Sequence, residues 1–207
     1  GNRKTRESVY KKIIEDWDKV ISKAALKLYG CEITAIGCAH VGGGPVSALA
    51  VGETANGGTL SEADIVRQFI RMVDGEGPLV LMGFNIRNFD IPVLRTRCIL
   101  LDIFWPSWLP QNRREDKYEK LYVFDIQDVF DEGNLDTWLR MAGLPPKTAK
   151  GGDAPNMTTA EVQQYVADDV ERERLLVRKI LPHIHQHGDL IHQMKEQIDL
   201  SSEENDE

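Results

Sequence analysis

Hydrophobic residues recur along this chain first with a helical period and then with a strand-like one. Residues 8–28 place apolar side chains at helical spacing with Lys and Glu opposite, which predicts one amphipathic helix. Two short apolar runs, 32–40 and 46–52, are joined by a glycine-rich turn and predict a β-hairpin. Ser61 can then cap a helix that extends to about Val73.

The second half of the chain predicts strands and helices in alternation. Its most apolar run, 78–82, lies between Gly77 and Gly83 and is typical of a buried central strand. The elements expected after it are a helix to about Leu101, a strand at 121–126, a helix at 135–141, a long helix from Thr158 or Thr159 to about Ile180, and a last helical segment at 189–200.

This order of elements predicts an α/β fold, a mixed β-sheet flanked by helices on both faces, because a hairpin precedes strand–helix alternation. Three segments are expected. Residues 1–30 form an N-terminal amphipathic helical segment, 31–187 form the main domain, and 188–207 form a C-terminal helix and acidic tail.

Charge and cysteine content limit the function classes. The formal charge of −8 argues against a protein that coats nucleic acid, although the acidic tail from Asp199 onward accounts for part of it. Three cysteines without a CxxC pair predict reduced thiols in a cytoplasmic protein. No apolar run approaches the roughly 20 residues that span a bilayer. The first residues do not resemble a signal peptide, because no basic stretch followed by an apolar one is found there.

Two distant segments carry the candidate chemistry. The first is Gly83–Asp90, with the sequence GFNIRNFD, where the predicted central strand ends and a helix begins with Asp90 in its first turn. The second is Tyr165–Asp169, with the sequence YVADD, in which the phenol and the last carboxylate lie four residues apart on one helical face. Two carboxylates with a phenol beside them suit a site that holds divalent metal against a phosphodiester.

These residues resemble motifs of the DEDD superfamily of 3′→5′ exonucleases, of the tyrosine-bearing DEDDy type. The branch they resemble is related to the exonuclease domain of B-family DNA polymerases. Asn85 to Asp90 is similar to the second motif of that family, and Tyr165 to Asp169 to its third, Tyr-x-x-x-Asp. The similarity extends over about residues 32–180. It implies a ribonuclease-H-like fold and a metal-dependent 3′→5′ exonuclease that releases nucleotides from single-stranded DNA ends.

The resemblance also implies roles for individual residues. Asp90 and Asp169 would be ligands of two Mg²⁺ or Mn²⁺ ions, whose chemistry suits hard carboxylate oxygens. Tyr165 would complete the catalytic set by orienting the attacking water. Asn85 and Phe89 would bind the terminal nucleotide, Phe89 by stacking.

The first motif of the family, Asp-x-Glu on an opening strand, is not found. Asp16 and Asp18 have a similar spacing but fall in a helical pattern, where such positions face apart. Three explanations are open: the strand lies outside these residues, Asp16, Asp18 or Glu32 takes its place, or the protein has lost catalysis. We favour the first.

Two other functions remain open beside the DNA exonuclease. One is a catalytically inactive nuclease-fold module for binding or assembly, and the other is an exoribonuclease of the same fold. Asp125 is expected to support the strand that carries it, and Asp136 to cap or pack beside its helix. A basic rim for the nucleic-acid strand could come from Arg87, Arg95, Arg97, Arg113 and Arg114.

Overall fold

The computed structural model describes residues 10–14, 31–75, 80–112, 122–130, 132–148, 154 and 156–183. Residues 10–14 are helical, within the helix predicted for 8–28, while the rest of that helix and the one predicted at 189–200 lie outside the described residues. The elements are β1 (Ala35–Cys38), β2 (Ser47–Ala50), β3 (Gly52–Glu53), β4 (Thr59–Leu60), α2 (Glu62–Gly75), β5 (Leu81–Gly83), α3 (Asp90–Leu100), β6 (Val123–Asp125), the 3₁₀-helix η1 (Ile126–Val129), α5 (Leu135–Met141), α6 (Thr159–Ile180) and the 3₁₀-helix η3 (Leu181–His183).

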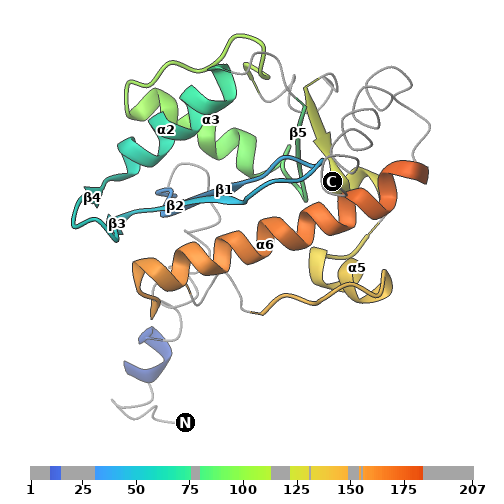
Figure 1. The fold of residues 1–207 in the computed structure, drawn as a ribbon. Helices are drawn as coiled ribbons and strands as arrows, with labels where there is room; N and C mark the ends of the chain where they lie inside the picture. The colour runs from blue at the N-terminus through green and yellow to red at the C-terminus, as the bar shows by residue number, and fades with distance from the viewer. Residues whose placement is uncertain are drawn as a thin grey trace, which may run out of the picture.

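The hairpin of β1 and β2 lies between helices. The strands pair antiparallel, with Ala35 opposite Ala50, and α2 contacts them on one side while α6 contacts them on the other (Figure 1). Gly37 lets α6 approach closely, because a Cβ at this position would lie 2.4 Å from a methyl carbon of Val166 and 2.7 Å from one of Val170. This glycine therefore sets the distance between the hairpin and α6.

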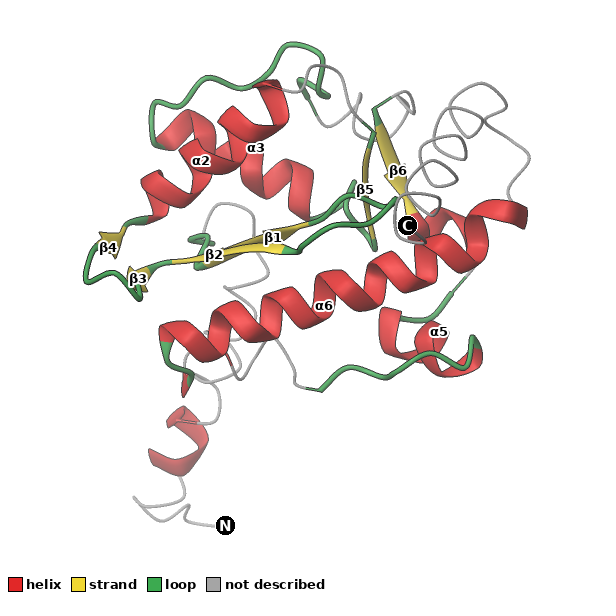
Figure 2. Ribbon diagram, viewed as in Figure 1, coloured by secondary structure: helices red, strands yellow, loops and turns green. Residues whose placement is uncertain are grey.

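The described strands form three separate pairs (Figure 2). β1–β2 and β3–β4 are antiparallel, whereas β5–β6 is parallel, with Met82 opposite Phe124. The α/β character, with both parallel and antiparallel pairing, is confirmed. A single sheet of the ribonuclease-H-like kind is not seen among the described strands, because no backbone ladder joins the hairpin to the β5–β6 pair.

Helix ends follow the predicted caps. Thr158 and Glu161 form a capping box at the start of α6, where the Thr158 N–H donates to the Glu161 carboxylate at 2.7 Å. Ser61 caps α2, and its hydroxyl donates to Asp64 at 2.6 Å. α5 has the predicted bounds, and Gly143 follows it with a φ of +69°, as expected for a residue that ends a helix.

Basic side chains fix α6 to the loops on its two flanks. Toward the hairpin, Arg174 donates to the Gly44 carbonyl at 2.8 Å and Arg178 donates to the Val41 carbonyl at 2.6 Å. Toward the segment after α5, Arg172 donates to the Pro146 carbonyl at 2.8 Å, and Lys179 donates to Ala142. These contacts determine which face of α6 is left for the candidate site.

Two apolar clusters form most of the core. One lies between the hairpin, α2 and α3 and includes Ile65, Val66 and Cys98. The other joins η1, α5 and α6 through Ile126, Leu139 and Leu176. None of the described helices combines the length and apolar character needed to cross a membrane.

Candidate active site

The candidate site is centred on one face of α6. Tyr165 and Asp169 are four residues apart, so both side chains share a face, and Glu173 lies one further turn along the same face. The acids between them are engaged elsewhere: Asp168 pairs with Arg172 at 3.6 Å, and Glu171 pairs with Arg174. The spacing of four thus selects one phenol and two carboxyl groups from an acidic stretch of helix.

Asp169 has one oxygen paired and one oxygen unpaired. Oδ2 accepts an ion pair from the Lys147 ammonium at 2.6 Å, with the two side chains 19% and 27% exposed. Oδ1 is buried and has no hydrogen-bond partner. An unpaired buried carboxylate oxygen is unfavourable unless something else binds it, so this atom marks a position for a donor or a cation.

Lys147 is a site residue that sequence reasoning missed. Its backbone N–H donates to Asp136 at 2.9 Å, and this contact holds the segment that follows α5. Burial disfavours the charged ammonium, but hydrogen bonding to Asp169 and the charges of Asp169 and Tyr165 outweigh it, so the pKa of Lys147 is raised. The predicted role of Asp136 beside its helix is confirmed, since it also pairs with Arg140 at 2.8 Å.

Tyr165 is hydrogen-bonded to both Asp169 and Lys147, and the Lys147 ammonium lies 5.7 Å from the centre of its ring. Burial raises the pKa of the phenol above its ordinary value, and the negative charge of Asp169 raises it further. Both effects favour the neutral phenol at neutral pH. In this state the hydroxyl can donate and accept a hydrogen bond.

Asp90 begins α3, as the sequence predicts. The residue as a whole is exposed, but burial of its carboxyl raises its pKa to about 6, and the charge of nearby Asp125 raises it as well. Because part of the residue is in contact with solvent, the effect of burial on the pKa is reduced. Burial and a neighbouring negative charge thus both favour the protonated form of this carboxyl.

Glu173 connects the two predicted carboxylates. Burial raises its pKa to about 8, and the charges of Asp90 and Asp169 raise it further, while the Phe84 N–H donates a hydrogen bond to it. Glu173 therefore lies near enough to Asp90 on α3 and to Asp169 on α6 for both charges to act on its carboxyl. Burial is the largest cause of this shift, and the two neighbouring negative charges add to it. The sequence signal that could have found it is the repeated spacing of four.

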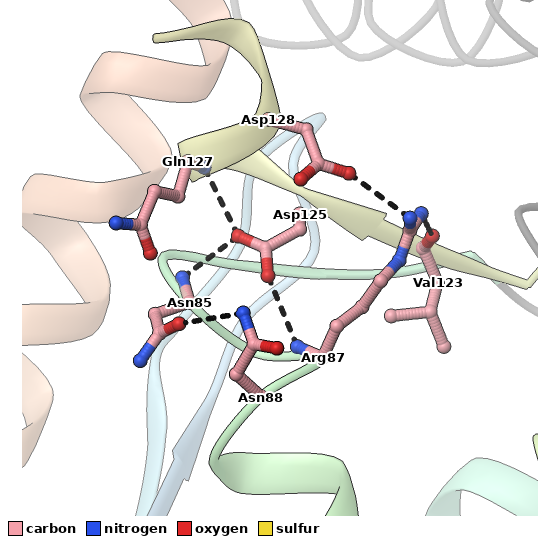
Figure 3. Close-up of polar contacts among 7 residues, drawn as sticks. All are labelled: Asn85, Arg87, Asn88, Val123, Asp125, Gln127 and Asp128. Carbon is pink, nitrogen blue, oxygen red and sulfur yellow. Dashed lines mark hydrogen bonds and ion pairs between the residues drawn. The ribbon is translucent and has the colours of Figure 1, made fainter. Parts of the chain in front are cut away.

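Asp125 has a supporting role, as predicted. It is 1% exposed and accepts the backbone N–H groups of Asn85 at 2.7 Å, Arg87 at 3.1 Å and Gln127 at 3.0 Å (Figure 3). A carboxylate with three donors has little capacity left for a further ligand. Asp125 therefore fixes the turn after β5, and with it the start of α3 and Asp90.

Asn85 and Phe89 are the predicted nucleotide-binding residues, and both belong to this turn. Asn85 has a φ of +63°, a left-handed conformation that asparagine tolerates, and its side-chain oxygen accepts from Asn88 at 3.0 Å. Phe89 precedes α3, is partly buried, and packs against the cluster of α2 and α3. Their roles in binding stay predictions.

The prediction of an arginine rim is wrong for Arg87, and it stays a prediction for Arg95 and Arg97, which are also engaged by the fold. Arg87 is buried, pairs with Asp128 at 3.0 Å and donates to the Val123 carbonyl (Figure 3). Arg97 forms a two-point ion pair with Glu62, and Arg95 donates to the Pro110 carbonyl at 3.0 Å. Each guanidinium thus serves the fold. Arg113 and Arg114 lie outside the described residues, as do Asp16 and Asp18.

The carboxylate chemistry of these residues suits a divalent cation, but in this structure the carboxyl groups are not close enough together to bind one. In favour are the unpaired buried oxygen of Asp169 and the carboxyls of Asp90 and Glu173, which carry raised pKa values. Against it, no group of three or more His, Cys, Asp or Glu in the described part of the chain is arranged to hold a metal ion. In this arrangement the Lys147 ammonium supplies the positive charge at Asp169.

Comparison with known proteins identifies the family. No curated protein and no solved structure matches the chain. A family model described as a predicted 3′-5′ exonuclease related to the exonuclease domain of PolB matches residues 24–172. This match covers more than half of the chain and includes Asn85, Asp90, Lys147, Tyr165 and Asp169. The protein therefore belongs to the family of predicted 3′-5′ exonucleases related to the exonuclease domain of PolB.

Proposed function

We propose that the protein is a metal-dependent 3′→5′ exonuclease that releases nucleotides from single-stranded DNA ends. The observation that carries the proposal is the buried, unpartnered Oδ1 of Asp169, beside the Oδ2 that pairs with Lys147. The charges of Asp90 and Asp169 both act on Glu173, which supports a shared site. We infer from this that the two motifs, far apart in the sequence, serve one site. Family membership supports a nuclease-type enzyme with a nucleic-acid substrate, and the metal, the strand type and the mechanism are our proposal.

Asp90 and Asp169 would hold Mg²⁺ or Mn²⁺, two ions in the complete site, because hard carboxylate oxygens are the ligands that these cations prefer. When bound, such ions supply an activated water and stabilise the charge on the leaving oxygen of a phosphodiester. The unpaired Oδ1 of Asp169 offers the donor atom, and Lys147 maintains the site while no cation is present.

Tyr165 would orient the attacking water. Its raised pKa keeps the phenol neutral, so it serves as a hydrogen-bonding group and not as a general base. Hydrogen bonds to Asp169 and Lys147 fix the hydroxyl beside the carboxylate that would hold the cation. Tyr165 would thus position the water molecule and would not take its proton.

The terminal nucleotide would bind at the turn after β5. Asn85 there presents its side chain from a left-handed backbone held by Asp125, and Phe89, which is partly buried, would stack on the base. We propose DNA as the substrate. RNA is the outcome to be tested beside it, because discrimination depends on how the site treats the 2′-hydroxyl.

One observation favours a second function, an inactive module for binding or assembly. Among the described residues no three acids are arranged as a metal site. In addition, the Lys147 ammonium forms an ion pair with the Asp169 carboxylate, where a cation would bind. A protein that had lost catalysis could keep this ion pair permanently. Metal binding separates the two functions, since the nuclease takes up Mn²⁺ and the module does not.

The test is digestion of 5′-labelled single-stranded DNA, and separately of RNA, by the chain with Mn²⁺. Asp169→Asn should lower cleavage by about 10³-fold, the loss that several kcal/mol of metal-assisted charge stabilisation would give. Asp168→Asn is the matched control, because Asp168 is the next residue on the helix and pairs with Arg172 instead. A descending ladder of DNA products, lost only in Asp169→Asn, supports the proposal. Equal cleavage by both variants contradicts it, and no cleavage from the folded protein favours the module.

A further inference from the structure

We propose that Asp136 is a positioning residue, which holds Lys147 in its ion pair with Asp169 and so sets how readily a cation displaces that ion pair. This inference rests on the function proposed above and extends it to a residue on α5 that acts through Lys147. It is carried by the hydrogen bonds that fix the backbone of Lys147, by the stiffness of the segment before it, and by the second contact of the Asp136 carboxylate.

The peptide group between Pro146 and Lys147 is held at both of its polar ends. Its N–H donates to Oδ1 of Asp136 on α5 at 2.9 Å, and its carbonyl accepts from Nε of Arg172 on α6 at 2.8 Å. The two helices, which lie beside each other (Figure 1), thus hold one peptide group between them. Because a peptide group is planar, fixing both ends also fixes the direction in which the Lys147 side chain leaves the backbone.

The segment before Lys147 adds little freedom. The Leu144 N–H donates to the Leu139 carbonyl at 2.8 Å, and Leu144 packs against the apolar cluster that joins α5 and α6. Pro145 and Pro146 follow, and the proline ring fixes the backbone φ at about −65°. The freedom that remains to Lys147 is therefore mostly in its side chain, whose ammonium ends in the ion pair with α6.

The Asp136 carboxylate is suited to act as an anchor. While Oδ1 accepts the Lys147 N–H, Oδ2 pairs with Nε of Arg140 at 2.8 Å, one turn further along α5. The hydrogen bond from Arg140, and after it the one from the Lys147 N–H, lower the pKa of Asp136 below its ordinary value, so the carboxylate is charged at neutral pH. A charged acceptor binds an N–H more strongly than a neutral one does.

This anchor bears on the competition at Asp169. The Lys147 ammonium and a cation would bind the same carboxylate, so a cation must displace the ammonium from Oδ2. A side chain on a fixed backbone loses less conformational entropy when its end forms an ion pair. Loosening the backbone of Lys147 therefore weakens the ion pair, and a cation then binds more readily. In this way Asp136 acts on the site from a neighbouring helix.

The first measurement follows the Lys147 ammonium in the metal-free whole chain by proton–nitrogen NMR of the lysine side chains. An ammonium in a lasting ion pair exchanges slowly with water and gives a signal, which Lys147→Met identifies by removing it. Asp136→Ala should weaken this signal, because the Lys147 N–H loses its acceptor. Asp136→Asn should restore it, because the amide oxygen can still accept that N–H.

Arg140→Gln is the matched control. It removes the other partner of the same carboxylate and leaves the acceptor of the Lys147 N–H in place, so the ammonium signal should persist. Pro146→Gly is a second variant, which loosens the same segment without changing any charge, and it should weaken the signal as Asp136→Ala does. Melting of each variant without metal confirms that it folds.

The second measurement is a titration with Mn²⁺ alone, followed by isothermal calorimetry. Asp136→Ala should bind Mn²⁺ more tightly by about fivefold, the change that corresponds to one ordinary hydrogen bond. A purely structural role would weaken binding or leave it unchanged. Asp136→Asn and Arg140→Gln should bind as the wild type does. Added to Lys147→Met, Asp136→Ala should have no further effect, because no ammonium is left to position.

The outcomes separate this inference from the proposed function. If the wild-type chain binds no Mn²⁺, the proposed function is wrong and the inference falls with it. If the wild type binds Mn²⁺ but Asp136→Ala keeps the ammonium signal, or binds Mn²⁺ no more tightly, the proposed site stands and Asp136 serves only the fold. Equal effects of Asp136→Ala and Asp136→Asn would assign the effect to the charge on α5 and overturn the inference. An ammonium signal absent from the wild type would overturn it too, since Lys147 would then not be held in solution.

Discussion

Two carboxylates in this protein have opposite surroundings. Asp125 accepts three backbone N–H groups and is 1% exposed, so its oxygens are satisfied by the fold. Asp169 has one oxygen paired with Lys147 and the other buried without a partner. The difference shows how a structural acid can be told from a functional one. Asp125 is hydrogen-bonded by backbone groups that are fixed parts of the fold, whereas Asp169 is paired with a lysine side chain that a ligand could displace.

The largest effect on stability is expected from Asp125→Ala. The change leaves three backbone N–H groups without their acceptor, and removing one partner of a buried charged network costs about 3–5 kcal/mol. Urea unfolding measures the free energy of unfolding of the variant. A loss below about 1 kcal/mol would mean that water replaces the carboxylate, and that the comparison with Asp169 does not hold.

Gly37→Ala should lower the free energy of unfolding by about 1–3 kcal/mol, the usual cost of overpacking. The new methyl group would lie 2.4 Å from Val166 and so must push α6 away from the hairpin. This shift moves Asp169 but leaves Asp125 in place. Cleavage should therefore fall while the turn after β5 stays protected in hydrogen exchange. Loss of protection at Asn85 and Arg87 as well would show that the two regions are not independent.

Glu173→Gln should stabilise the metal-free protein at alkaline pH. The pKa of this carboxyl is raised from 4.5 to about 8 in the folded state, by burial first, with the charges of Asp90, Asp169 and Lys147 also acting on it. Between these pH values the folded protein keeps a proton that the unfolded protein has lost, so stability falls as the pH rises. Glutamine does not titrate, so the variant does not lose stability in this way as the pH rises.

Melting in the presence of EDTA at pH 5 and pH 8.5 tests the effect. The melting temperature of Glu173→Gln should exceed that of the wild type at pH 8.5, by roughly 2–4 °C for each kcal/mol, and the two should converge at pH 5. A constant difference at both pH values would show that the charge of Glu173 is not the cause.

Asp169→Asn should have the smallest effect on stability, within about 1 kcal/mol, as is usual for a polar replacement that leaves the core intact. Asparagine keeps an oxygen that can accept from Lys147. Denaturation curves of this variant and of Asp125→Ala should therefore differ clearly. If Asp169→Asn were the more damaging change, Asp169 would be a structural residue and the proposed function would lose its main ligand.

The sequence predicted the elements whose signals are local. α5 has the predicted bounds, and α6 begins at the predicted capping threonine, because caps and helix-ending glycines act within a few residues. The position of Asp90 in the first turn of α3 follows for the same reason. The arrangement of the strands was not predicted in this detail, because pairing depends on distant segments.

The candidate site could be predicted only in part. Asp90, Tyr165 and Asp169 belong to recognisable motifs. Lys147 lies in a segment without hydrophobic periodicity, and only the folded chain brings it to Asp169. Glu173 repeats a spacing of four, but the residues around it resemble an ordinary charged helix face. Arg87 was misplaced because no sequence signal shows that its guanidinium turns inward to Val123 and Asp128.

The most direct test of the central claim is a crystal structure of the protein with Mn²⁺, with the ion located by its anomalous scattering. The account predicts a manganese peak beside Asp169 and Asp90, with Lys147 displaced from Asp169, and no peak at Asp125. A structure that shows the Lys147–Asp169 ion pair intact at high Mn²⁺ concentration, with no ion beside either acid, would contradict it.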